Sequence, residues 1–256
     1  MIKIHAIIVG RLKSQRLRKK ALLKLGAYNL SSFLIHRIQN FNYQNCELNF
    51  TYATSNLKGD DLLEKELNEH VFIYRGDANN VIKRMLLADK IRNLKSDYFV
   101  RITADNPFTC PDHLQKMINC IKYNNYPEYI AIPDLNTGLR CELIKSSYLE
   151  KINRKVKNPQ SSEYMTFMLN RPDKGYIKYL KPEVPIKKRD ISFTVDESFQ
   201  YDFVNKIVNL GFSPQDSFLK LFNLVSNLNY ICQDKVRANE YISNDILDKY
   251  NCHWKD

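Results

Sequence analysis

Short apolar segments that alternate with amphipathic segments are the feature that most restricts how this chain can fold. Residues 4–9 (IHAIIV) form a nearly continuous apolar run, as expected of a short strand that is buried on both faces of a sheet. Residues 30–38 carry apolar side chains at helical spacing behind Ser31 and Ser32, which are suitable helix N-caps. Strands that are separated by helices predict β-α-β units and a mostly parallel sheet.

The alternation continues along the chain and changes after residue 103. It predicts strands over residues 48–54, 71–74 and 98–103, and helices over residues 60–68 and 80–95. In the second half it predicts helices over residues 111–124, 146–152, 162–169, 198–210 and 215–227, and strands over residues 129–133, 139–144, 177–180 and 191–195. Because no internal repeat or low-complexity linker interrupts the 256 residues, we expect a single α/β domain with a mixed sheet.

Positive charge is concentrated directly after the first predicted strand. The formal net charge is +11, and every charged residue between Arg11 and Lys24 is basic. A charge run is often only a solvated face, but ligands of parallel α/β sheets bind at the carboxyl ends of strands, where this run begins. Its position therefore favours a phosphate-binding loop, with Arg and Lys side chains neutralising a triphosphate.

Several classes of protein are disfavoured by the sequence. The six cysteines show no C-x-x-C pair, so neither a zinc site nor a disulfide framework is indicated. No apolar run approaches the length of a membrane span, and the first ten residues lack the architecture of a signal peptide. We expect a cytoplasmic protein without membrane insertion.

The loop over residues 10–20 (GRLKSQRLRKK) matches neither the Walker loop nor the dinucleotide-binding fingerprint. Its spacing R-x-x-S-x-R-L-x-x-K resembles the "ARxGSxRLPGK" signature of the bacterial sugar-acid cytidylyltransferases, a family that includes SpsF-like, acylneuraminate and ketodeoxyoctonate cytidylyltransferases. The residues that carry the match are Arg11, Ser14, Arg16, Leu17 and Lys20. Lys13, Arg18 and Lys19 stand where the family usually has Gly, Pro and Gly, so the backbone path of the loop is open.

Further segments resemble the same family in the same order, from residue 4 to about residue 210. They are residues 52–56 (YATSN), 72–81 (FIYRGDANNV), 99–107 (FVRITADNP), 139–144 (LRCELI) and 191–202 (ISFTVDESFQYD). The resemblance implies a Rossmann-like nucleotidyltransferase (GT-A-like) three-layer fold with a mixed, mostly parallel sheet. It also implies a nucleotide-binding half over about residues 1–125 and an acceptor-binding half over about residues 126–256.

The resemblance also implies roles for individual residues. Arg11, Arg16 and Lys20 would stabilise the leaving pyrophosphate, whereas Gly10, Ser14, Arg75 and Arg101 would bind the nucleotide, with Arg75 reading the base. Asp105 and Asp196 would hold Mg²⁺, and Asn106 and Glu142 would contact the acceptor, with a second metal as the alternative for Glu142. Four residues also have a structural alternative: Arg75 as a surface ion-pair partner, Arg101 as the partner of a carboxylate, Asp105 in an Asx-turn and Asp196 as a helix N-cap.

The implied reaction transfers CMP from CTP to a sugar acid or related acidic acceptor and releases pyrophosphate, for the synthesis of surface glycans. Residues 161–166 (SSEYMT) resemble the family's "REHVTp" segment, but Ser162 and Tyr164 replace its Arg and His, so the acceptor's identity is open. The expected partners are CTP and a small acidic acceptor, with no nucleic acid, and a homodimer is compatible with the sequence.

Three other functions are also compatible with parts of the sequence. A nucleotide-sugar-dependent glycosyltransferase of related fold would be expected to carry a D-x-D motif at a strand end, where this chain has Asp105-Asn-Pro. A nucleic-acid-binding module would interleave aromatic and basic residues, but residues 11–24 contain no aromatic. A catalytically impaired nucleotide-binding homologue is allowed by the altered basic loop.

Overall fold

A seven-stranded sheet forms the centre of the computed structural model, which describes residues 1–13, 16–183, 191–226, 228 and 244–255. The strand order is β5-β4-β1-β6-β8-β7-β9. The strands are β1 (Ile2–Val9), β4 (Cys46–Ser55), β5 (Phe72–Gly76), β6 (Tyr98–Thr103), β7 (Tyr129–Ala131), β8 (Glu142–Lys145) and β9 (Ile177–Tyr179). Only β8 runs antiparallel to its neighbours among the strands of this sheet, which confirms the expected mixed, mostly parallel sheet.

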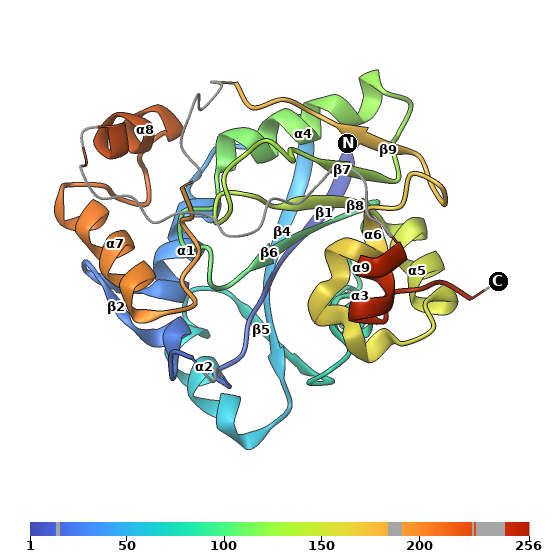
Figure 1. Ribbon diagram of the computed structural model, residues 1–256, viewed down its shortest axis with the longest axis horizontal. Coiled ribbons are helices and arrows are strands. Elements are labelled where there is room, and N and C mark those ends of the chain that lie inside the picture. The colour runs from blue at the N-terminus through green and yellow to red at the C-terminus, as the bar shows by residue number, and fades with distance from the viewer. Residues whose placement is uncertain (14–15, 184–190, 227, 229–243, 256) are drawn as a thin grey trace.

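Helices cover both faces of the sheet and complete the expected three-layer α/β fold (Figure 1). One hydrophobic cluster joins the sheet to α1 (Leu30–Gln39), α2 (Asp61–Leu67), α4 (Pro111–Tyr123), α7 (Ser198–Asn209) and α8 (Phe218–Ser226). A second cluster joins the opposite face to α3 (Val81–Ile91), α5 (Ser146–Lys155), α6 (Met165–Leu169) and α9 (Asn244–Tyr250). No helix in the described ranges is long and apolar enough to cross a membrane.

The central strand β1 is buried as its apolar sequence predicts. It pairs in parallel with β4 on one side and β6 on the other, so its carboxyl end lies between theirs. Its one polar core residue, His5, is bonded through Nδ1 to Asp89 at 3.0 Å and through Nε2 to Thr51 at 2.7 Å. Burial lowers the pKa of His5, although the Asp89 carboxylate opposes this shift, and the imidazole has a structural role outside the cavity described below.

Several local predictions were wrong in detail. The residues 191–195 form no sheet strand, because the amides of Phe193 and Val195 bond to the loop carbonyls of Thr137 and Asp105 (2.8 and 2.9 Å). The cap of α1 is Asn29, which forms a capping box with Ser32, so Ser31 and Ser32 lie inside the helix.

Some short elements were missed or merged by the sequence pattern. A 3-10 helix (Pro159–Tyr164) precedes α6 where one helix was expected, and the hairpin of β2 (Lys24–Leu25) and β3 (Tyr28–Asn29) was not predicted. Strands of two residues are too short to show a period in the sequence.

Candidate active site

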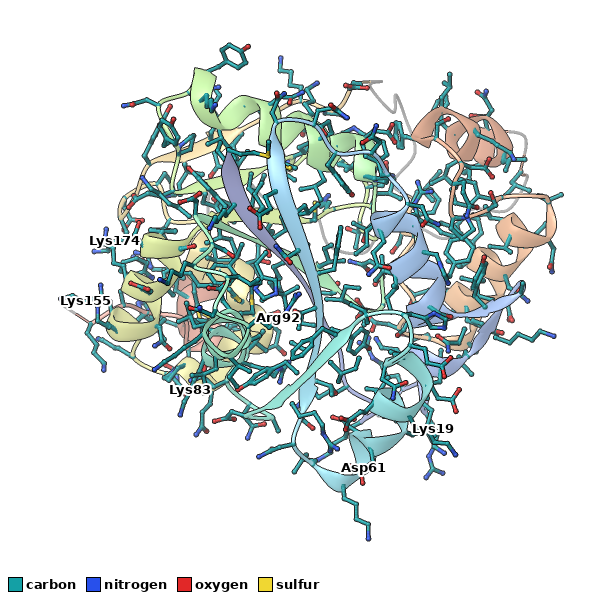
Figure 2. The ribbon with its side chains drawn as sticks, turned by 180° about the vertical axis from the view of Figure 1, so that it is seen from behind. Lys19, Asp61, Lys83, Arg92, Lys155 and Lys174 are labelled. Carbon is teal, nitrogen blue, oxygen red and sulfur yellow. The ribbon has the colours of Figure 1, made fainter. Side chains whose placement is uncertain are left out.

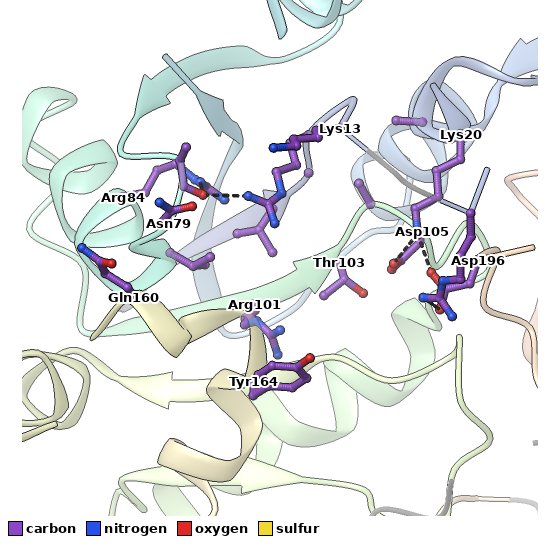
Figure 3. Close-up of a pocket in the computed structure, with 18 residues that line it drawn as sticks. Lys13, Lys20, Asn79, Arg84, Arg101, Thr103, Asp105, Gln160, Tyr164 and Asp196 are labelled. Carbon is purple, nitrogen blue, oxygen red and sulfur yellow. Dashed lines mark hydrogen bonds and ion pairs between the residues drawn. The ribbon is translucent and has the colours of Figure 1, made fainter. Parts of the chain in front are cut away.

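A cavity of about 660 Å³ opens at the carboxyl ends of β1 and β6, where ligands of parallel α/β sheets bind (Figure 3). The basic side chains in its wall are Arg11, Lys13, Arg16, Lys20, Arg84 and Arg101, and the acidic ones are Asp105 and Asp196. The other lining residues are Val9, Gly10, Ala21, Ala78, Asn79, Val81, Thr103, Ala104, Gln160 and Tyr164. A wall with this excess of positive charge is suited to a polyphosphate.

Gly10 ends β1 at the floor of the cavity. A Cβ atom at this position would overlap the hydroxyl of Tyr52 and the Cβ of Ala104. Its amide donates to the carbonyl of Ala53 at 3.3 Å. The structure therefore explains this glycine by the close approach of neighbouring side chains, and its nucleotide contact stays a prediction.

The basic loop that follows Gly10 is held by a buried carboxylate. Asp60 at the end of the 3-10 helix η2 (Lys58–Asp60) accepts from the amide of Leu12 at 2.6 Å and from the hydroxyl of Ser55. Later in the loop, Lys19 adopts the left-handed conformation (φ 52°, ψ 29°) and leads into η1 (Lys20–Leu22). Ser14, a predicted nucleotide ligand, lies outside the described residues.

Lys20, Asp105 and Asp196 meet at one end of the cavity, although they lie far apart in the sequence. Lys20 Nζ donates to Asp105 Oδ2 at 2.9 Å and to Asp196 Oδ1 at 2.6 Å (Figure 3). The amide of Val195 bonds to the carbonyl of Asp105 and so places Asp196 beside it. Arg16 NH2 lies 3.0 Å from Asp196 Oδ2, so four of the predicted loop and metal residues meet here.

The pKa values at this cluster follow from its charges. Burial alone would lower the pKa of Lys20, but the carboxylates of Asp105 and Asp196 outweigh it and raise this pKa above its ordinary value. Burial alone would raise the pKa of Asp105, but the Lys20 ammonium and its hydrogen bond lower it. Both groups are therefore charged at neutral pH, and the carboxylate of Asp105 is available as a ligand.

The two aspartates fit a divalent metal by their chemistry. Carboxylate oxygens are the hard donors that Mg²⁺ prefers, and here two of them converge on one cation, the ammonium of Lys20. In the described ranges no group of three or more His, Cys, Asp or Glu side chains is placed to hold a metal. A metal bound by two carboxylates would complete its coordination with water and phosphate oxygens, as Mg²⁺ commonly does.

Arg101 is in the cavity wall, whereas Glu142 lies behind it. Arg101 NH1 lies 2.5 Å from Glu142 Oε2 and 3.2 Å from Thr166 Oγ1. Glu142 also accepts from the hydroxyl of Tyr129 at 2.7 Å, and burial, followed by this carboxylate, raises the pKa of Tyr129 well above its ordinary value. Glu142 is not among the lining residues, and its contact with the acceptor stays a prediction.

Two other predicted site residues do not line the cavity. Arg75 bonds to the carboxylates of Asp61 (2.6 Å) and Glu64 (3.2 Å) on α2, an arrangement that matches its structural alternative. Asn106 donates from Nδ2 to Thr103 Oγ1 at 2.7 Å and has no partner for its buried Oδ1 among the described residues. The base-reading role of Arg75 and the acceptor role of Asn106 stay predictions.

Some residues of the wall were not predicted from the sequence. Arg84, Asn79, Gln160 and Tyr164 line the cavity, but none was assigned a role from the sequence. Arg84 lies in the apolar face of a correctly predicted helix, beside Ile82 and Met85. A basic residue among buried positions is the one signal that could have marked it.

Comparisons with known proteins agree with this arrangement. A family model described as Cytidylyltransferase matches residues 5–233. The spore coat polysaccharide biosynthesis protein SpsF of Bacillus subtilis (strain 168) is 28% identical over 225 residues, which cover 86% of this chain and 92% of that protein.

Solved structures share the fold. A cytidylyltransferase from Leptospira borgpetersenii superposes with a TM-score of 0.77 at 23% identity and covers 88% of this chain and 94% of its own. A CMP:2-keto-3-deoxy-manno-octonic acid synthetase complexed with CTP has a TM-score of 0.61 at 11% identity and covers 82% of this chain and 100% of its own. The family match extends over most of the sequence and includes the elements that form the cavity, and this chain therefore belongs to the cytidylyltransferase family.

Proposed function

We propose that this cytidylyltransferase transfers CMP from CTP to a hydroxyl group of a sugar acid or related acidic acceptor, in the synthesis of a surface glycan. The observation that carries the proposal is the cavity in which a cluster of cations faces two convergent aspartates. The relative that acts in spore coat polysaccharide biosynthesis supports the glycan role, and the structural neighbour complexed with CTP supports the nucleotide.

The reaction requires an in-line attack of the acceptor oxygen on the α-phosphorus. The new P–O bond forms as the bond to the pyrophosphate oxygen breaks, so negative charge grows on the leaving group. Lys20, Arg16 and Arg11 stabilise that charge because they lie in the wall of the same cavity. Asp105 and Asp196 would hold Mg²⁺, which neutralises charge on the phosphate oxygens when it is bound.

The remaining wall is available for the acceptor. Arg101, Gln160 and Tyr164 line it (Figure 3). The ion pair with Glu142 fixes the Arg101 guanidinium in place. An arginine held by a second charged residue is pre-organised to bind an anionic or hydroxyl group of a substrate. Glu142 thus contributes to acceptor binding by orienting Arg101.

Pyrophosphate release from each of the four nucleoside triphosphates, with Mg²⁺ and a panel of acidic sugars, tests this function. We expect release with CTP and at least one acceptor. Absence of CTP-dependent release with every acceptor, together with no thermal shift on addition of CTP, would refute the proposal.

Asp105→Asn tests the assigned chemistry of the site. It removes a charged ligand for the metal, so kcat should fall by at least about 100-fold. The matched control is Asp202→Asn, an exposed aspartate on α7, which should keep the wild-type kcat. Wild-type turnover in Asp105→Asn would show that Asp105 caps a turn and does not bind the metal.

A further inference from the structure

Arg84 is a buried cation in the cavity wall that the proposed chemistry does not use. It lies in the first turns of α3, its side chain is 3% exposed, and NH1 donates to the carbonyl of Asp77 at 2.8 Å. Its Nε has no hydrogen-bond partner among the described residues. The hydrogen bonds of Arg84 within the described residues use only NH1, so its guanidinium keeps donor capacity in the cavity wall.

A second guanidinium lies next to it. Arg11 NH1 donates to the carbonyl of Ala78 at 3.2 Å, and Arg84 NH1 lies 3.5 Å from the same oxygen. Figure 3 shows Arg84 and Asn79 at one end of the cavity, and Lys20 with Asp105 and Asp196 at the other. One end of the cavity wall thus carries both cations and carboxylates, whereas the other end carries cations.

The charge of Arg84 is not balanced by an ion pair in the described part of the chain. Burial and the nearby charge of Arg11 lower the pKa of Arg84 to about 10, against the opposing charges of Asp60 and Asp77, so the guanidinium is still protonated at neutral pH. A desolvated cation that is bonded only to carbonyl groups is unfavourable until an anion pairs with it.

The segment that leads into α3 forms the same part of the wall. Ala78 and Asn79 before the helix and Val81 in its first turn line the cavity. Asp77 Oδ1 accepts from the amides of Asn79 (2.9 Å) and Asn80 (3.1 Å), and Asn80 accepts from the amide of Lys83 at 2.9 Å. These amides are therefore bonded within the protein, and the guanidinium groups of Arg84 and Arg11 are the donors that a ligand would meet there.

We propose that Arg84 and Arg11, beside the N-terminus of α3, form an anion subsite for a phosphate or carboxylate group that is not bonded to the α-phosphorus. This inference rests on the proposed function, which supplies two sources of the anion. The first is the γ-phosphate of CTP, which leaves as part of the pyrophosphate, and the second is the carboxylate of the acceptor. The subsite would fix one substrate at a distance from the reacting α-phosphate.

The test compares Arg84→Met with Lys83→Met, which removes an exposed cation from the same helix outside the cavity (Figure 2). Calorimetry would measure the Kd values of CTP, CMP, cytidine and inorganic tripolyphosphate, and steady-state kinetics the KM of the acceptor. If the subsite holds the terminal phosphates, the Kd values of CTP and tripolyphosphate should rise about tenfold or more in Arg84→Met, with those of CMP and cytidine unchanged. If it holds the acceptor, only the KM of the acceptor should rise by that factor.

Two outcomes would overturn the subsite. Wild-type Kd and KM values throughout in Arg84→Met would show that no anion depends on this side chain. An equal loss of cytidine binding would show that Arg84 reads the base instead. Failure of the wild-type enzyme to release pyrophosphate would refute the proposed function, whereas tripolyphosphate binding tests the subsite without catalysis.

Folding is monitored by the melting temperature of the ligand-free protein. Arg84→Met should keep or raise the wild-type Tm, because it removes a buried cation that lacks a balancing anion. If Arg84→Met does not fold, Arg84→Gln gives the same test, because it removes the charge but keeps a side chain that can donate to the carbonyl of Asp77. Wild-type affinities in Arg84→Gln for all four ligands, with an unchanged acceptor KM, would then overturn the proposal.

Discussion

Lys19 is a residue of the basic loop that departs from the pattern of the resembling sequences. It stands where the resembling sequences have glycine, and its backbone nevertheless adopts the left-handed conformation that glycine favours. The side chain is exposed, and Figure 2 shows it at the surface. Lysine in place of glycine therefore adds a positive charge. It also adds local strain of about 1 kcal/mol, because a Cβ atom crowds the neighbouring carbonyl at positive φ.

Lys19→Gly should raise the free energy of unfolding by about 0.5–1 kcal/mol, since relief of the strain exceeds the entropy that glycine adds to the unfolded chain. Urea denaturation measures this change in the free energy of unfolding. Lys24→Gly is the matched control, because Lys24 lies in β2 without positive φ and the same change there should destabilise by about 0.5–1 kcal/mol. A lower stability of Lys19→Gly would contradict the assigned strain.

At the scale of elements, the site depends on how the loop after β1 is attached to its neighbours. Asp60, which is 3% exposed, joins the amide of Leu12 to the end of β4 at Ser55. The backbone path of the loop could not be predicted from the sequence, because two glycines of the family pattern are replaced. The hydrogen bonds of Asp60 hold the loop without requiring those glycines. The loop thus leaves β1 in a fixed direction toward the cavity.

Asp60→Asn should weaken the binding of CTP about tenfold, because the new amide group cannot accept from both the Leu12 amide and the Ser55 hydroxyl. A buried donor without a partner costs about 1–3 kcal/mol, so the melting temperature should fall as well. Glu66→Gln is the control, since Glu66 is an exposed carboxylate on α2 and its loss should leave CTP binding unchanged. Wild-type CTP affinity in Asp60→Asn would show that the loop is positioned by other contacts.

At the scale of the whole molecule, Lys20 joins segments that the chain brings together only when it folds. One ammonium bonds to a carboxylate from the loop after β6 and to another from the segment before α7. The pKa of Lys20 is raised and that of Asp105 is lowered. The lowered pKa stabilises the fold above the ordinary aspartate value of 3.8, and this contribution is lost as the pH falls through the folded value.

Lys20→Met should therefore destabilise the protein by on the order of 2 kcal/mol at neutral pH, and the difference from wild type should shrink as the pH falls below about 4. The raised pKa of Lys20 also stabilises the fold, and this contribution is lost only as the pH rises above the ordinary lysine value of 10.5 and through the folded value. Urea midpoints between about pH 3 and pH 7 measure the difference. Lys24→Met, at an exposed lysine, should show none, and a pH-independent difference for Lys20→Met would contradict the ion-pair assignment.

Much of the fold and the general position of the site could be predicted from the sequence. Apolar periodicity located β1, β4, β6 and the longer helices, because burial of a strand or helix face leaves a local pattern. The order of segments identified the loop and both aspartates, which the structure brings to one end of the cavity. Residues 191–195 were predicted as a strand because they form an apolar run. Such a run does not reveal the hydrogen-bond partners of its backbone, which here lie in loops.

The sequence by itself determined the α/β class, the basic loop after β1 and the family, since each is encoded in local pattern or in the order of motifs. Only the tertiary structure decided which side chains face the cavity. It paired Arg75 with α2, placed Glu142 behind Arg101 and brought Arg84 into the wall. The physical reason is that the charge of a side chain follows from its residue type, whereas its burial and its partners depend on segments that meet only in the folded chain.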